Sequence, residues 1–310
     1  MTEILPDALP TNWVDRHAPV ALQPWLKLGR FDRPAGIWLL MLPGWWGVAL
    51  AGASRGNGPD LVLLIKIFVG AALMRAAGCA FNDIVDRDFD AQVARTAMRP
   101  IPSGQITVPQ AWAFLLGCCL ISFGILVTLP LFAIGLGVGS LALVAAYPFM
   151  KRITWWPQAW LGLTFNWGIL LGYAAATGHL EAPALVLYAA AVFWTLGYDT
   201  IYAVQDLEDD ALAGVKSSAL RLGDKAPRAV LGFYVLAFTL ALTAAAMAYL
   251  GPLFLPPAAL FGLHLSRQAA ALDIRDGAGA LALFKSNSLA GLVMFVALVA
   301  GFWRGPVGMF

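Results

Sequence analysis

Long runs of apolar residues, separated by short polar segments, make up most of this chain. Each run has about 18 to 24 residues, which is enough for a helix to cross the roughly 30 Å hydrocarbon core of a bilayer. The pattern predicts membrane-spanning helices near residues 35–53, 61–81, 110–127, 130–148, 158–177, 183–203, 228–250, 252–266 and 283–303. We therefore expect an all-α, polytopic membrane protein that forms a single bundle of nine transmembrane helices.

The segment before the first run is of a different kind. Residues 1–33 contain several prolines and charges but no apolar run, so we expect no cleavable signal peptide there. Residues 25–33 are amphipathic enough to lie at a membrane surface. The expected organisation is an N-terminal arm and interfacial segment over 1–33, followed by one nine-helix domain over 34–310.

Composition and charge agree with a membrane protein and assign its orientation. The chain has 310 residues, of which 60% are hydrophobic and 12% are charged, whereas soluble domains carry about 25% charged residues. Most of the 20 Lys and Arg residues fall in the N-terminal segment and in the loops after even-numbered runs. The positive-inside rule then places the N-terminus and these loops in the cytoplasm, and predicts a protein of the cytoplasmic (inner) membrane.

Acidic residues concentrate in two short segments, each at the end of an apolar run. In the first, Asn82, Asp86 and Asp90 are spaced four residues apart, so on a helix they form one stripe of oxygen ligands. The second segment has a similar stripe, which consists of Asp199, Tyr202, Asp206 and Asp210. Four membrane crossings separate the segments, so both face the same side, where we expect a cytoplasm-facing cavity.

This arrangement predicts a particular chemistry. Neighbouring carboxylates repel one another, so two acidic stripes imply a cation that neutralises them. Oxygen ligands without His or Cys favour a hard cation, Mg²⁺ before Zn²⁺. Two carboxylate clusters that face each other could hold Mg²⁺ ions on a diphosphate, while Arg and Lys side chains bind its remaining oxygens. We expect the neighbouring Asp83, Asp88, Glu208 and Asp209 to be solvated charges, although Asp83 could replace Asn82 in the register of the stripe.

The amino-acid sequences of these two segments resemble the motifs of a known family. Segment 82–90, with its continuation 93–104, resembles the first aspartate-rich motif of the UbiA superfamily of intramembrane aromatic prenyltransferases. Segment 197–210, followed by 214–218, resembles the second motif, with Ser218 where the family pattern has Thr. The resemblance extends from Arg30 to about residue 303. Within the superfamily, both motifs are most similar to those of the 4-hydroxybenzoate polyprenyltransferases of ubiquinone synthesis.

The resemblance implies a role for each matching residue. The Mg²⁺ ligands would be Asn82, Asp86, Asp90, Asp206 and Asp210. The side chains that contact the diphosphate would be Arg30, Arg95 and Lys216. Arg152 would pair with the carboxylate of the benzoate, and Asp199, Tyr202 or Asp206 would position its phenol.

The implied reaction is a Mg²⁺-dependent transfer of a polyprenyl group from polyprenyl diphosphate to 4-hydroxybenzoate, at the carbon ortho to the phenol. The expected partners are these two substrates and membrane lipid, with no nucleic acid. Two alternatives remain open at this point. One is a prenyltransferase of the same superfamily with another acceptor, such as a naphthoate, homogentisate, haem or a chlorophyllide. The other is a Mg²⁺-coupled transporter, which predicts acidic residues along a path through the bilayer.

Overall fold

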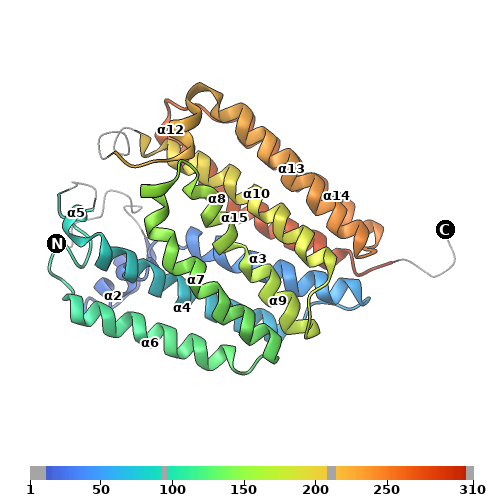
Figure 1. Ribbon diagram of the computed structural model, residues 1–310, viewed down its shortest axis with the longest axis horizontal. Coiled ribbons are helices and arrows are strands. Elements are labelled where there is room, and N and C mark those ends of the chain that lie inside the picture. The colour runs from blue at the N-terminus through green and yellow to red at the C-terminus, as the bar shows by residue number, and fades with distance from the viewer. Residues whose placement is uncertain (1–11, 93–95, 208–213, 305–310) are drawn as a thin grey trace. The chain divides into compact units, whose positions relative to one another are not determined.

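The computed structural model describes residues 12–92, 96–207 and 214–304, and within them every regular element is helical (Figure 1). The all-α prediction is therefore confirmed. The helices are α1 (Trp13–His17), α2 (Gln23–Leu28), α3 (Ala35–Ser54), α4 (Leu61–Val85), α5 (Arg87–Asp90), α6 (Val108–Leu126), α7 (Leu131–Ile153), α8 (Pro157–Phe165), α9 (Trp167–Thr177), α10 (Ala182–Val204), α12 (Ser218–Leu222), α13 (Ala226–Met247), α14 (Leu255–Ala271) and α15 (Gly277–Ala300), with 3₁₀ turns at Gly223–Lys225 and Pro252–Phe254.

Six helical stretches are long and apolar enough to cross a membrane: Ala35–Ser54, Leu61–Val85, Val108–Leu126, Ala182–Val204, Ser218–Met247 and Gly277–Ala300. The protein is an integral membrane protein. Helices occupy each of the nine predicted ranges, and the number of membrane crossings beyond these six stays a prediction.

The fifth predicted span is not a single helix, because α8 and α9 meet at Asn166. The Asn166 side chain is fully buried, and its Nδ2 donates to the carbonyls of Gly162 (2.8 Å) and Ala191 (3.1 Å) and to the Thr195 hydroxyl (2.7 Å). An Asn amide that bonds backbone carbonyls competes with the helical ladder, which favours an interruption at this position.

The described chain divides into two compact units. The first consists of Met1–Trp38 and Phe68–Thr128, and the second of Leu39–Ile67 and Leu129–Phe310. Each unit has its own buried cluster of hydrophobic residues. The first acidic motif belongs to the first unit, and the second acidic motif belongs to the second unit.

Small residues allow close packing in the first unit. Its buried cluster contains Ala76, Ala77 and Ala80 of α4, together with the following residues of α2, α4, α6 and the segment before α6: Leu28, Ile84, Ile101, Ile106, Ala111, Leu115 and Cys118. Small side chains let helices approach in lipid, where burial of apolar surface gives little drive to association. This cluster underlies the end of α4, where the first acidic motif begins.

The core of the second unit is centred on α10. Trp194 of α10 stacks on Trp46 with ring centroids 4.9 Å apart, and the Trp46 indole donates to the Gly291 carbonyl at 2.8 Å. Gly197 lies directly against the ring of Tyr234 on α13, so any larger side chain at 197 would collide with that ring. This close approach holds α10 against α13 at Gly197, where the second acidic motif begins.

Candidate active site

The first motif spans a helix break. Helix α4 ends at Val85 and α5 begins at Arg87. The prediction that the stripe lies on one continuous helix is therefore wrong. The helical spacing nevertheless survives the break, because the Asp86 N–H donates to the Asn82 carbonyl at 2.9 Å and the Asp90 N–H donates to the Asp86 carbonyl at 2.8 Å. Asn82, Asp86 and Asp90 therefore still follow one another at one-turn intervals.

Two of these carboxylates are removed from solvent. Asp86 is 7% exposed and Asp90 is 4% exposed, while Asn82 is half-buried. Burial of a charge is costly unless it is paired. Burial raises the pKa of Asp90, although the nearby Arg99 guanidinium, which donates to Asp90 Oδ2 at 2.8 Å, acts in the opposite direction.

The centre of the first motif is Asp83, which is 0% exposed. One nitrogen of Arg30 donates to both of its oxygens, at 2.6 and 2.9 Å, and Arg99 donates to Asp83 Oδ1 at 3.3 Å. The prediction that Asp83 is a solvated charge is wrong, because residues distant in sequence bury it and pair with it. Asp88 is solvated as predicted, with an 85% exposed side chain.

Arg30 reaches the motif from 53 residues away in the chain. Its backbone has a φ of 58°, which is unfavourable for a side chain of this size and indicates that the surroundings hold it there. Its second terminal nitrogen donates to the Lys27 carbonyl at 3.0 Å. Burial alone would lower the pKa of Arg30, but the charge of Asp83, its hydrogen bond with Arg30 and the charge of Asp32 act together in the opposite direction, so the pKa lies above its usual range.

Arg99 is the residue that sequence reasoning missed at this motif. It links Asp83 to Asp90, and its Nε is buried with no hydrogen-bond acceptor among the described residues. The sequence could have suggested Arg99, because this residue lies in the segment that continues the motif, four residues after Arg95. Arg95 itself lies outside the described residues.

The second motif follows the end of α10. Asp199 and Tyr202 lie on the last turns of this helix, and Asp206 lies in the turn that follows, where its N–H donates to the Ala203 carbonyl at 3.3 Å. All three side chains are half-buried. The Tyr202 ring packs on Phe284 of α15 with centroids 4.6 Å apart, which limits how the phenol can turn. Asp210, Glu208 and Asp209 lie outside the described residues.

The segment after the second motif is anchored to α10. The hydroxyls of Ser218 and Thr200 are 2.7 Å apart, and the Ser218 N–H donates to the side chain of Gln158 at 3.0 Å. Ser217 caps α12 by accepting from the Leu220 N–H at 3.3 Å. The hydroxyl at position 218 therefore fixes the start of α12 beside α10.

Lys216 precedes this anchor and lies near the end of α7. Its Nζ donates to the Ile153 carbonyl at 3.2 Å and is 5.9 Å from the centre of the Trp155 ring. Arg152, the neighbour of Ile153, is exposed at the end of the same helix. Lys216 thus bonds the main-chain carbonyl of the residue that follows Arg152, another of the predicted basic residues.

The donor set of the first motif fits a hard cation. Both oxygens of Asp83 are engaged by arginine, whereas Asn82, Asp86 and Asp90 supply amide and carboxylate oxygens, the ligands that Mg²⁺ prefers. In the residues that the structure describes, no group of three or more His, Cys, Asp and Glu side chains is close enough to hold a metal ion. The predicted ligand set combines both motifs and includes Asp210, so sharing of an ion between the motifs stays a prediction.

Sequence comparison decides the family. The model of the UbiA prenyltransferase family matches residues 40–303, a range that includes both motifs. This chain belongs to the UbiA prenyltransferase family. It is 46% identical to the mitochondrial 4-hydroxybenzoate polyprenyltransferase of Rattus norvegicus, over 93% of this chain and 77% of that protein. It is 42% identical to the protein of the same name in Arabidopsis thaliana, over 94% and 71% of the two chains.

Solved structures of UbiA homologues share the fold. An apo structure of a homologue from Aeropyrum pernix K1 has a TM-score of 0.69 and 28% identity, and the match covers 85% of this chain and 96% of that one. A homologue from Archaeoglobus fulgidus, solved with GPP and Mg²⁺ bound, has a TM-score of 0.61 over 87% and 99% of the chains. At 17% identity, this second likeness speaks for the fold alone.

Proposed function

We propose that this member of the UbiA family is a 4-hydroxybenzoate polyprenyltransferase of ubiquinone synthesis. The observation that carries the proposal is the 46% identity to a 4-hydroxybenzoate polyprenyltransferase over 93% of the chain. The pairing of buried aspartates with arginines in the first motif supports it, because a diphosphate site needs fixed positive and negative groups side by side.

Asn82, Asp86, Asp90, Asp206 and Asp210 are the proposed ligands of Mg²⁺. Bound Mg²⁺ supplies positive charge that stabilises the diphosphate as it leaves. The half-buried positions of Asn82 and Asp206 suit groups that exchange solvent for a ligand.

Arg30, Arg95 and Lys216 are the proposed contacts of the diphosphate. We add Arg99 to this set, because its buried Nε lacks an acceptor among the described residues and an anionic oxygen would satisfy it. Asp83 has a different role, since it holds the guanidinium groups of Arg30 and Arg99 in place at distances of 2.6 and 3.3 Å. Such prior positioning lets basic groups stabilise developing charge without rearrangement.

Arg152 is the proposed partner of the benzoate carboxylate, since a guanidinium and a carboxylate form two parallel hydrogen bonds that orient the ring. Asp199, Tyr202 or Asp206 positions the phenol. The C–O bond of the prenyl diphosphate breaks, and diphosphate leaves with the electron pair. The ortho carbon of the phenol forms the new C–C bond, and the ring then loses the proton from that carbon.

The proposal includes a location and an organisation. The protein would lie in the cytoplasmic (inner) membrane with its N-terminus and active site facing the cytoplasm. Residues 34–310 would form one nine-helix prenyltransferase domain after the arm and interfacial segment of 1–33. Membrane lipid would surround the isoprenoid chain, while the small acid would enter from the aqueous side.

The test is an assay of the purified full chain with Mg²⁺, 4-hydroxybenzoate and geranyl diphosphate, with product detection by mass. We expect a prenylated 4-hydroxybenzoate that disappears when EDTA replaces Mg²⁺. Asp86→Ala should abolish turnover, whereas Asp88→Ala, at a solvated position of the same motif, should not. A panel of naphthoate, homogentisate and a chlorophyllide tests the acceptor. Preference for any of these would overturn the assignment of 4-hydroxybenzoate while keeping the reaction class.

A further inference from the structure

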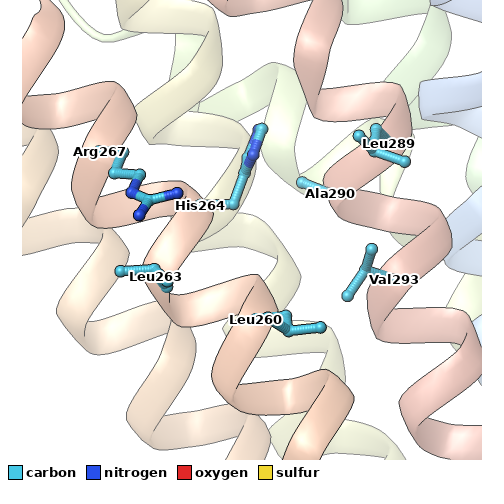
Figure 2. A pocket seen from close by; sticks show the side chains of 7 residues that line it. All are labelled: Leu260, Leu263, His264, Arg267, Leu289, Ala290 and Val293. Atoms are coloured by element: carbon cyan, nitrogen blue, oxygen red, sulfur yellow. The ribbon is translucent and has the colours of Figure 1, made fainter.

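A pocket of about 210 Å³ lies between α14 and α15, and none of the residues that line it belongs to either acidic motif (Figure 2). Its lining consists of Leu260, Leu263, His264, Arg267, Leu289, Ala290 and Val293. Figure 2 shows Arg267 and His264 toward one end of the pocket and Leu260 and Val293 toward the other. The pocket therefore has a polar end and an apolar end.

His264 is the last member of a chain of buried hydrogen bonds. The Trp194 indole donates to Asn287 Oδ1 at 2.9 Å, and Asn287 Nδ2 donates to Gln268 Oε1 at 3.2 Å. Gln268 Nε2 in turn lies 2.9 Å from His264 Nε2. Tyr234 adds a second donor to Gln268 Oε1, at 2.7 Å. The chain thus connects α10, α13, α15 and α14 within the second unit.

The donor-to-acceptor direction of this series of hydrogen bonds is fixed at its first member, the Trp194 indole. An indole N–H only donates, so the Asn287 oxygen must face Trp194 and its amide nitrogen must face Gln268. Gln268 consequently accepts from Asn287 and donates to His264. His264 Nε2 is then an acceptor, and the neutral ring carries its proton on Nδ1. No described residue accepts a hydrogen bond from His264 Nδ1, which leaves one N–H donor for the pocket that His264 lines.

The polar end of the pocket is suited to an anion. Arg267 is exposed and lies three residues after His264, on the same side of α14. A guanidinium beside an N–H donor favours a phosphate or carboxylate. The donor is strengthened further because successive hydrogen bonds in one direction polarise one another.

The apolar end indicates what kind of molecule carries the anion. Leu260 and Leu263 are exposed, although they are large and hydrophobic, as expected for side chains that face lipid. Arg267 lies four residues before the end of α14, roughly 6 Å along the helix, and Leu260 lies roughly 10 Å further from that end. This separation matches that between a lipid phosphate and the first part of its acyl chains.

We propose that the pocket between α14 and α15 binds an anionic phospholipid. Arg267 and the Nδ1–H of His264 bind the phosphate, and one acyl chain lies along Leu260, Leu263 and Val293. Phosphatidylglycerol is the probe of this chemistry. The proposal is independent of the acceptor or the prenyl donor of the reaction, because none of these residues belongs to the proposed active site.

The test uses the delipidated full chain in detergent and counts bound lipid by native mass spectrometry, with phosphatidylglycerol or phosphatidylcholine of the same acyl chains. We expect a preference for phosphatidylglycerol in the unmodified protein. Arg267→Gln should reduce its binding about fivefold, the effect of one basic residue at a lipid surface. Arg228→Gln, at an exposed position near the start of α13, removes the same charge and should leave binding unchanged.

Two further variants separate the pocket from general charge effects. His264→Phe keeps an aromatic ring but removes the donor, and should weaken binding of both lipids, because each carries the phosphate that the donor contacts. Val293→Trp fills the apolar end and should reduce binding of both lipids. Equal losses in Arg267→Gln and Arg228→Gln would overturn the proposal. Displacement of the lipid by inorganic phosphate alone, or by geranyl diphosphate, would also overturn it in favour of a phosphate site or a prenyl-donor site.

Discussion

The two acidic motifs have a similar spacing of polar residues, but their carboxylates differ in burial and in the basic side chains that the structure pairs with them. In the first, Asp83 and Asp90 are buried and paired with Arg30 and Arg99. In the second, Asp199 and Asp206 are half-buried, and the nearby basic residue Lys216 bonds a main-chain carbonyl. The first motif is a preassembled ionic network that stabilises its own unit, whereas the second leaves its polar groups closer to solvent. We therefore expect substitutions in the first to affect stability and activity together, and those in the second to affect mainly activity.

The strongest test of this contrast is Asp83→Ala. The substitution leaves the buried guanidinium of Arg30 without its carboxylate partner and removes one of the two partners of the half-buried Arg99, so we expect a loss of about 3 to 5 kcal/mol in the free energy of unfolding. Unfolding in a mixed-detergent titration measures it. Asp88→Ala is the matched control and should be close to neutral, because its side chain is exposed. Equal stability of the two variants would show that the buried network contributes nothing to the fold.

Asp206→Ala should behave in the opposite way. Its side chain is half-buried at the end of α10, so we expect a change of less than about 1 kcal/mol in unfolding free energy. The rate of prenyl transfer should fall by at least about 100-fold, as when a group that stabilises transition-state charge is removed. Asp224→Ala, at an exposed position of the same unit, should retain full activity. Unfolding of Asp206→Ala at the level of Asp83→Ala would remove the contrast between the motifs.

Lys216→Ala sharpens the comparison on the basic side. Loss of one charged hydrogen bond to the diphosphate should raise the KM for the prenyl donor by about tenfold. The KM for the aromatic acceptor should stay the same, because Arg152 is the group proposed to bind it. Lys225→Ala removes an exposed lysine from the 3₁₀ turn Gly223–Lys225 and should change neither constant. An equal rise in both KM values would show that Lys216 acts through the local structure around Ile153 instead.

The smallest expected effect is on the pH dependence of Tm. It concerns Glu181, at the end of α10 opposite to the second motif. Hydrogen bonds from His179 and Tyr173 lower the pKa of Glu181, which precedes this helix. A lowered carboxylate pKa contributes stability above the usual pKa of Glu, about 4.3, and this contribution is lost as the pH falls through the lowered value. We expect a slight decrease in Tm from pH 5 downward that Glu181→Gln removes. If Glu181→Gln kept the same decrease in Tm, the acid sensitivity would come from other carboxylates of the chain.

Much of the fold could be predicted because it depends on local pattern. Runs of apolar residues predicted the existence of α3, α4, α6, α7, α10, α13, α14 and α15, since length and hydropathy decide whether a helix suits a bilayer, whereas some helix ends differ from the prediction by up to six residues, as at the start of α15. The spacing of Asn82, Asp86 and Asp90 likewise predicted residues that follow one another by turns. The break within the fifth predicted range could not be predicted, because the bonds that interrupt the helix at Asn166 reach Ala191 and Thr195 on α10.

The sequence by itself determined the class of protein, the two acidic motifs and their likeness to the UbiA family, because each of these depends on neighbours in the chain. Only the tertiary structure decided that Asp83 is an internal partner and not a solvated charge, and that Arg99 belongs to the first motif. It also decided that His264 ends a directed chain of hydrogen bonds at a pocket. In each case the deciding contact joins residues that the spacing along the chain does not pair, from 16 residues for Asp83 and Arg99 to 93 for Trp194 and Asn287. Burial and pairing are set by such contacts, and local spacing carries no information about them.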